Sequence, residues 1–268
     1  MPSGHQRNNY LHDRIGFFTQ FFALAQTGNL MCTGRQNNPA YMQEGNDRNG
    51  ISAILFDMDN TLFDLVGAQI AACDHVVRYL GCHDGEELFS YFLNTHHGFE
   101  SPENIRQYMT ERRLSTDGMF DEACRIYHTE KLRHIVPYSG VSDALRTIAG
   151  QGYPMGIVTD AEKKDAIPRL AKCDILPYFD CMVTFDMVNK KKPAAEPFLA
   201  ALAAMDLRPD QVLFVGDSPR RDIEPCRKLG IKTVYARYGD RFLQTRGCTG
   251  ADYCIDTMDE LPGIIERL

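Results

Sequence analysis

The stretch Ile51-Ser-Ala-Ile-Leu-Phe-Asp57-Met-Asp59-Asn-Thr61 decides the fold of this chain. Its first six residues form a short, largely apolar run that follows the turn-forming pair Asn49-Gly50. A run of this kind, bounded by a turn signal, predicts a buried β-strand. Because acidic residues come directly after it, the strand would deliver carboxylates to the edge of the sheet where it ends.

Similar strand patterns recur along the chain, and helix patterns separate them. Further strands are expected at residues 155–158, 181–185, 212–215, 231–235 and 253–255. Helices are expected at residues 142–149, 163–173, 197–205, 222–229 and 258–268. Strands that alternate with helices at this spacing predict an α/β fold, with a doubly wound parallel sheet covered by helices on both faces.

One long interval, between Asp64 and Val141, breaks the alternation. It has no strand pattern, whereas apolar residues recur at helical spacing in residues 68–80, 86–93, 102–113 and 120–135. A connection this long is rare in a compact sheet, so the interval predicts an inserted helical subdomain. We therefore expect an α/β core made of residues 51–64 and 151–268, and an all-helical cap made of residues 65–150.

Residues 1–50 differ in composition, because Asn, Gln, Gly and Arg dominate and the one coherent apolar stretch lies at residues 15–24. We expect a poorly ordered extension without an assignable function, or sequence upstream of a start at Met42. A secretory signal peptide is the alternative, since Arg7 and Arg14 precede the apolar stretch, although Gln20 interrupts it.

The composition excludes several classes of function. With 44% hydrophobic and 24% charged residues, the chain is an ordinary globular protein, and no apolar run approaches the ~20 residues of a membrane-spanning helix. A formal charge of −7 has the wrong sign for binding nucleic acid. Nine cysteines without a C-x-x-C pair indicate neither a zinc site nor a disulfide framework. A cytoplasmic monomer or homodimer is expected.

The residues that carry chemistry follow the predicted strands. Ligands bind beyond the carboxyl ends of the strands in sheets of this kind. Candidate residues at or near those ends are Asp57, Asp59, Thr159, Lys192, Asp217 and Asp222. Separate segments thus deliver carboxylates, one hydroxyl and one ammonium group to the same edge.

This collection favours phosphoryl transfer. Asp57, Asp59 and Asp217 would repel one another on a shared edge, and a hard divalent cation with oxygen ligands relieves such repulsion. Mg²⁺ fits best, because it takes a few carboxylates together with water and a substrate phosphate. Lys192 and the hydroxyl of Thr159 would supply the donors that the oxygens of a transferring phosphoryl group require.

Plainer interpretations of single residues remain open. Lys190 or Lys191 could take the place assigned to Lys192, because the three lysines are consecutive. Thr159 could simply cap the helix that follows its strand. Asp64, where the chain enters the cap, is as well explained as a hinge or surface residue.

Four segments occur in a fixed order along the chain. They are Asp57-Met-Asp-Asn-Thr-Leu62, Thr159, Lys192-Pro-Ala-Ala-Glu-Pro-Phe198 and Gly216-Asp-Ser-Pro-Arg-Arg-Asp222. Together they resemble the four motifs of the haloacid dehalogenase superfamily, in the branch with a helical cap inserted after the first motif. Each segment is weak evidence alone, but the order and the cap-sized insert make the combination specific. The resemblance covers Ile51 to Leu268.

The resemblance implies a role for each residue. Asp57 would be the nucleophile that forms an aspartyl-phosphate, and Asp59 the general acid for the leaving group and then the base for the hydrolytic water. Thr159 would bind the phosphoryl oxygens. Lys192 would neutralise both the nucleophile and the phosphate.

The resemblance also implies a Mg²⁺ site. Asp57, the backbone carbonyl of Asp59 and Asp217 would bind the ion, and Asp222 would orient Lys192 or metal-bound water. Two positions depart from the common pattern. Asn60 replaces a frequent Gly, and Arg221 stands where Asn often precedes the last Asp.

The implied activity is that of a Mg²⁺-dependent phosphatase acting on a small phosphorylated metabolite, such as phosphoglycolate, glyceraldehyde 3-phosphate, a sugar phosphate or a nucleotide. The cap would close over the substrate. A phosphomutase of the same fold is the main alternative, because it uses the same residues. A phospho-signalling receiver domain is disfavoured, since its metal-binding acids precede the acceptor strand. A non-catalytic protein on this fold is disfavoured because all four motif acids are present.

Overall fold

The computed structural model describes residues 50–94, 96–115, 117–241, 247 and 249–268. The expectations for the extension therefore lie, except at Gly50, outside the described residues. The described residues form two compact units, one made of residues 50–61 together with Ser139–Leu268, and one made of Leu62–Tyr138. We call the first the core unit and the second the helical unit.

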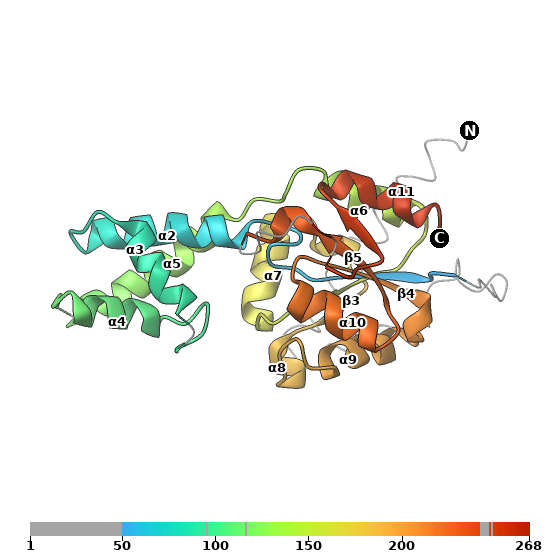
Figure 1. The fold of residues 1–268 in the computed structure, drawn as a ribbon. Helices are drawn as coiled ribbons and strands as arrows, with labels where there is room; N and C mark the ends of the chain where they lie inside the picture. The colour runs from blue at the N-terminus through green and yellow to red at the C-terminus, as the bar shows by residue number, and fades with distance from the viewer. Residues whose placement is uncertain (1–49, 95, 116, 242–246, 248) are drawn as a thin grey trace. The chain divides into compact units, whose positions relative to one another are not determined.

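A six-stranded parallel sheet organises the core unit (Figure 1). Its strands are β1 (Ala53–Phe56), β2 (Met155–Val158), β3 (Cys181–Val183), β4 (Val212–Gly216), β5 (Lys232–Ala236) and β6 (Tyr253–Ile255). They lie in the order β3-β2-β1-β4-β5-β6, and every neighbouring pair is parallel. All six lie within or beside the predicted segments, and the predicted α/β class is confirmed.

Helices cover both faces of this sheet, as Figure 1 shows. They are α6 (Val141–Gly150), α7 (Lys163–Lys172), α8 (Phe185–Val188), α9 (Glu196–Met205), α10 (Glu224–Lys228) and α11 (Leu261–Ile265). Helices α6 and α11 lie side by side on one face, whereas α9 and α10 lie on the other. Beneath α9, the ring of Phe198 packs edge-on against Phe214 of β4, with ring centroids 5.2 Å apart. This packing belongs to a buried apolar cluster between the sheet and α9.

Two predicted elements have different ends in the structure. Strand β3 ends at Val183 rather than at residue 185. The backbone N–H of Phe185 donates to the carbonyl of Ala161 instead of to a neighbouring strand, and Phe185 is the first residue of α8. The helix expected at residues 222–229 is a wide turn, η4 (Pro219–Ile223), followed by α10. Pro225 explains the break, since proline is tolerated in the first turn of a helix but not in its interior.

The helical unit contains α2 (Leu65–Tyr79), α3 (Gly85–Leu93), α4 (Glu103–Glu111) and α5 (Met119–His134). Asp64 is the N-cap of α2, the first helix of this unit. Its Oδ1 accepts a hydrogen bond of 2.8 Å from the N–H of Gly67. Inside the unit, the rings of Phe92 and Tyr127 stack with centroids 4.9 Å apart.

The boundaries of the units correct the predicted ones. The helical unit ends at Tyr138, so residues 139–150, which were predicted to belong to the cap, lie in the core unit. The reason is that α6 packs against α11 and the neighbouring turn η6 (Met258–Glu260). The sequence pattern could place α6 as a helix but could not show which unit it packs on.

Two further observations concern membrane-spanning helices and the cysteines. Within the described part of the chain, no helix is both long enough and apolar enough to cross a membrane. Cys181 of β3 and Cys254 of β6 are disulfide-bonded. These strands are the two opposite edges of the sheet, so the two cysteines do not pair with each other. The sequence pattern indicated no disulfide framework, and these two disulfide-bonded cysteines depart from that prediction.

Candidate active site

The site lies where the strand order changes direction, at the carboxyl ends of β1 and β4. Asp57 directly follows β1 and Asp217 directly follows β4, and these two strands are paired. One carboxylate oxygen of each of Asp57, Asp217 and Asp222 lies within 4.8 Å of those of the other two. All three side chains are buried. Loops at such a switch point are free to bind a ligand, because the helices that follow the two strands leave in opposite directions.

Two glycines permit the close approach of these segments. A Cβ atom at Gly216 would lie 2.6 Å from Cβ of Asp222, and one at Gly239 would lie 1.8 Å from the carbonyl oxygen of Asn60. Asn60 itself has a φ of 64°, a left-handed conformation that Asn tolerates better than most residues. The departure from Gly at this position is thus compatible with the turn after Asp57.

Lys192 joins two of the carboxylates. Its Nζ donates to Oδ1 of Asp57 and, at 2.7 Å, to Oδ1 of Asp222. Of the three consecutive lysines, Lys190 and Lys191 are exposed, whereas Lys192 is buried. The backbone N–H of Lys192 also donates to Oδ1 of Asp160 at 2.8 Å, which fixes the loop that carries it.

Thr61 links Asp57 to the third carboxylate, that of Asp217. Its Oγ1 lies 3.3 Å from Oδ2 of Asp57 and 3.4 Å from Oδ1 of Asp217, and it accepts a hydrogen bond of 3.1 Å from the N–H of Asp217. A hydroxyl has only one hydrogen to donate, so the two carboxylates share it. Tyr238 holds Thr61 in place by donating from its hydroxyl to the carbonyl of Thr61 at 2.7 Å.

The charges in this cluster shift the pKa values of its members in opposite directions. Burial opposes the ionisation of Asp57, but the charges of Lys192 and Arg221 outweigh it and hold the pKa of Asp57 below its ordinary value. Burial, together with the negative charges of Asp57 and Asp222, raises the pKa of Asp217. Burial also raises the pKa of Asp222, to about 6, against the opposing charge of Lys192.

These residues fit a hard divalent cation. The raised pKa of Asp217 means that its negative charge is poorly compensated by the protein, and a cation beside Asp57 and Asp217 would supply the missing charge. Asp222 is already engaged at both oxygens, because Oδ1 accepts from Lys192 and Oδ2 accepts from the N–H of Ser218 at 3.0 Å. Asp222 therefore positions Lys192.

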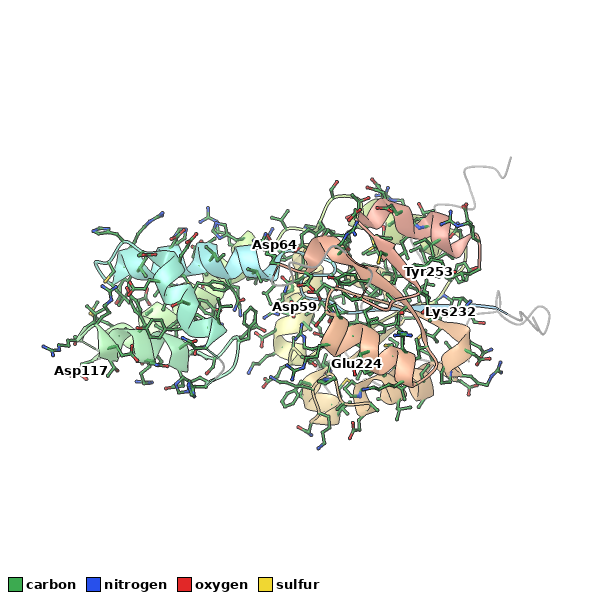
Figure 2. The ribbon with its side chains drawn as sticks, in the orientation of Figure 1. Asp59, Asp64, Asp117, Glu224, Lys232 and Tyr253 are labelled. Carbon is green, nitrogen blue, oxygen red and sulfur yellow. The ribbon has the colours of Figure 1, made fainter. Side chains whose placement is uncertain are left out.

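The side chain of Asp59 contacts Arg169, for which the sequence predicted no role. Arg169 of α7 donates from Nη1 to both carboxylate oxygens of Asp59, at 2.9 and 3.0 Å. Asp59 is labelled in Figure 2. The side chain of Arg169 is only 3% exposed. Because Arg169 is one of several basic residues on α7, its sequence context gave no signal for this contact.

Thr159 follows β2 and is buried beside β3. Its N–H donates to the carbonyl of Val183 at 2.9 Å, and its Oγ1 accepts from the N–H of Ala161 at 3.1 Å. This hydroxyl therefore binds a backbone N–H of the loop that follows β2. The same hydroxyl still has a hydrogen that can be donated to a phosphoryl oxygen, so capping and phosphate binding are compatible.

Arg221 is the second departure from the family pattern, and Asp160 holds its side chain. Its Nη1 donates to Oδ2 of Asp160 at 3.3 Å, and its charge contributes to the lowered pKa of Asp57. Asp160 thus holds both the loop of Lys192 and the side chain of Arg221. Thr61, Asp160, Arg169 and Arg221 are site residues without a predicted role. Thr61 and Arg221 could have been found, because they lie inside the quoted motifs.

Known proteins resemble this chain in sequence and in fold. The model of the haloacid dehalogenase-like hydrolase family matches residues 54–236. A glyceraldehyde 3-phosphate phosphatase from Pyrococcus furiosus is 26% identical over 225 residues, covering 81% of this chain and 94% of that protein. A phosphoglycolate phosphatase from Photorhabdus laumondii is 29% identical over 226 residues, covering 79% and 91%.

A solved structure shares the fold. It is described as a candidate β-phosphoglucomutase from Thermotoga maritima and superposes with a TM-score of 0.69 at 22% identity, covering 81% of this chain and 100% of that one. Because the family model matches more than half of the chain, the chain belongs to the haloacid dehalogenase-like hydrolases, the family that its four motifs resemble.

Proposed function

We propose that this protein is a Mg²⁺-dependent phosphatase that hydrolyses a small phosphorylated metabolite through an aspartyl-phosphate on Asp57. The observation that carries the proposal is the state of Asp57: a buried carboxylate kept ionised by Lys192 and Arg221, at the edge of the sheet where ligands bind. An ionised carboxylate held beside positive charge can attack the phosphorus of an incoming phosphate ester.

The proposed first step transfers the phosphoryl group. A carboxylate oxygen of Asp57 forms a bond to phosphorus as the ester oxygen leaves, and the leaving oxygen takes a proton from Asp59. Lys192 and the hydroxyl of Thr159 stabilise the negative charge on the phosphoryl oxygens. A bound Mg²⁺, held by Asp57, Asp217 and the backbone carbonyl of Asp59, would supply further positive charge to the phosphate.

The second step hydrolyses the intermediate. Water attacks the phosphorus of the aspartyl-phosphate, its proton passes to Asp59, and the bond to Asp57 breaks, which restores the ionised Asp57 and the protonated Asp59 and releases phosphate. The two hydrogen bonds from Arg169 hold the carboxyl group of Asp59 in one orientation.

The names of the relatives narrow the substrates to test first. We propose small three-carbon and two-carbon phosphates, because the relatives include enzymes named for glyceraldehyde 3-phosphate and phosphoglycolate. A phosphomutase is the second candidate, since the structural neighbour described above is assigned to that activity. A mutase would interconvert sugar phosphates and release little free phosphate.

The test is hydrolysis of p-nitrophenyl phosphate with Mg²⁺ and with EDTA. Asp57→Asn removes the nucleophile and is expected to lower the rate at least about 10³-fold. Asp143→Asn is the matched control, because Asp143 lies on α6 with its side chain 74% exposed. Equal rates for wild type and Asp57→Asn would show that the nucleophile is misassigned.

Acid-quench experiments separate the candidate activities. With a phosphatase, a burst of enzyme-bound phosphate is followed by steady release of inorganic phosphate from phosphoglycolate or glyceraldehyde 3-phosphate. With a mutase, sugar phosphates would be interconverted at a rate well above phosphate release. A protein that is labelled once by a phosphoryl donor and then retains the label would instead fit a signalling role.

A further inference from the structure

We propose that the helical unit carries a second metal site, formed by His75 of α2 and by Glu130 and His134 of α5, for a divalent transition-metal ion such as Zn²⁺. The site is independent of the carboxylate cluster in the core unit and of the proposed phosphatase activity. One ligand atom from each of the three side chains lies within 4.8 Å of those of the other two.

The local fold brings the three side chains together. Glu130 and His134 are four residues apart on α5, so they share one face of that helix. Helices α2 and α5 pack along each other, and this places His75 opposite that face. The rings of His75 and His134 lie 5.7 Å apart between centroids.

The distances suit an ion between the ligands. Oε2 of Glu130 lies 3.6 Å from Nε2 of His75 and also 3.6 Å from Nδ1 of the His134 ring, whose other nitrogen, Nε2, would bind the ion. With metal–ligand bonds of about 2.1 Å, neighbouring ligand atoms in a tetrahedral site lie about 3.4 Å apart. Glu130 and His75 are therefore already close to this spacing. The histidines keep 37% of their side-chain surface exposed, so water can complete the coordination.

A hydrogen bond made by one ring nitrogen of His134 orients the ring. Nδ1 of His134 lies 2.8 Å from the carbonyl oxygen of Glu130. A carbonyl oxygen only accepts, so Nδ1 carries the hydrogen and Nε2 keeps the lone pair that binds metal. Metal-bound histidines usually have a partner of this kind on the second nitrogen, because it fixes the tautomer.

The choice of ions follows from the ligand atoms. Two imidazoles and one carboxylate suit Zn²⁺, Co²⁺, Ni²⁺ or Cu²⁺, whereas Mg²⁺ and Ca²⁺ prefer oxygen ligands alone. Arg133 competes for the carboxylate, since its Nη1 lies 3.5 Å from Oε2 of Glu130. With 70% of its side chain exposed, Arg133 can move into solvent when an ion binds.

The consequence of binding would be a link between the two longest helices of this unit. An ion held by α2 and α5 stabilises the folded unit in proportion to its concentration relative to the dissociation constant. Metal binding would thus stiffen the helical unit without any contribution from the carboxylates of the core unit.

The experiment is a Co²⁺ titration of the purified protein in excess Mg²⁺, which keeps the carboxylate cluster occupied. Wild type is expected to bind one Co²⁺ per chain at this site, with the visible absorption bands of imidazole ligation, and Zn²⁺ should displace it. His75→Ala and His134→Ala each remove a metal ligand. They should weaken Co²⁺ binding by more than the 10–100-fold that is typical of removing a residue hydrogen-bonded to a ligand. Both variants should keep their p-nitrophenyl phosphatase activity.

Two further variants sharpen the result. His83→Ala removes an exposed histidine of the same unit and should bind Co²⁺ as wild type does. Arg133→Ala removes the competing guanidinium and should bind Co²⁺ at least as tightly as wild type. Unchanged affinity in both His75→Ala and His134→Ala would overturn the proposal.

A measurement on the wild-type chain does not depend on the folding of any variant. Long-range ¹H–¹⁵N spectra resolve the imidazole nitrogens, and substoichiometric Co²⁺ should broaden the signals of His75 and His134 before that of His83. Broadening that begins at His83, or that is equal at every histidine, would also overturn the proposal.

Discussion

The core unit and the helical unit each bury a lysine, and they do so in different surroundings. Lys192 of the core unit contacts two carboxylates, those of Asp57 and Asp222, and all three side chains are at most 4% exposed. Lys131 of the helical unit pairs at 2.7 Å with Glu100, whose side chain is 29% exposed, and lies 5.0 Å from the ring centre of Tyr127.

The two interiors therefore differ in the role of their buried charges. Burying a charge costs free energy unless partners compensate it, so a closed group of buried charges is a weak device for stability. It is an effective device for chemistry, because charges act strongly where water is excluded. The interior of the helical unit is instead mainly apolar, with Phe92, Ile105 and Tyr108 fully buried. Its stability rests on packing.

Replacing each buried lysine by Met is the strongest test of this contrast. Lys192→Met leaves Asp57 and Asp222 without their shared cation and is expected to destabilise the core unit by about 3–5 kcal/mol. It should also lower the rate at least about 10²–10³-fold. Lys131→Met should cost only about 1–2 kcal/mol and leave the rate unchanged. Urea unfolding and p-nitrophenyl phosphate hydrolysis measure both effects.

The pair of variants can also contradict the contrast. If both lysines cost the same in stability, burial alone would set the cost and the second carboxylate of the core unit would be irrelevant. If Lys131→Met abolished activity, the helical unit would contribute to the chemistry through Lys131.

The packing of the helical unit is tested by truncating one of its aromatic residues. Phe92 is fully buried and stacks on Tyr127, so Phe92→Ala is expected to cost about 3–5 kcal/mol. Leu93→Ala is the matched control, because Leu93 is the next residue of α3 and is 42% exposed. Hydrogen exchange of the amides of α2–α5 should report the loss in the first variant and not in the second.

The same contrast explains how much the sequence could predict. The motif residues after β1 and β4 were predictable, because parallel strands end at one edge and their following residues meet there. The four helices of the helical unit were predictable from periodicity, since each has one apolar face. Their interior chemistry was not, because periodicity shows which residues are buried and not which polar groups they meet.

Two failures have specific physical reasons. Arg169 was missed because α7 carries Lys163, Lys164 and Lys172 as well, and only the three-dimensional fold shows which cation turns toward Asp59. The end of the helical unit was predicted at residue 150 rather than at Tyr138, because the apolar face of α6 does not by itself show which unit the helix packs on. In both cases a contact between segments distant in sequence decides the outcome.

A smaller effect is expected when Asp222 is changed, since it acts through Lys192. Asn has one acceptor oxygen, whereas Asp222 accepts from both Lys192 and the N–H of Ser218, so Asp222→Asn leaves one of these donors without its partner. We expect a fall in rate of about 10–100-fold, as is common for residues that position a catalytic group. Steady-state kinetics should show the loss in kcat rather than in KM, and a rate equal to that of Asp57→Asn would mean that Asp222 contacts the substrate.

The smallest effect should come from a surface ion pair of the helical unit. Glu103 and Arg106 pair at 3.0 Å on α4, with side chains 49% and 45% exposed, and the guanidinium of Arg106 lies 3.6 Å from the ring centre of Phe120. Arg106→Ala should therefore cost more than Glu103→Ala, because it also removes the contact with the ring. In a double-mutant cycle, the coupling of the pair itself should be at most about 0.5 kcal/mol. A coupling as large as the cost of Lys131→Met would mean that surface charge, and not packing, holds this unit together.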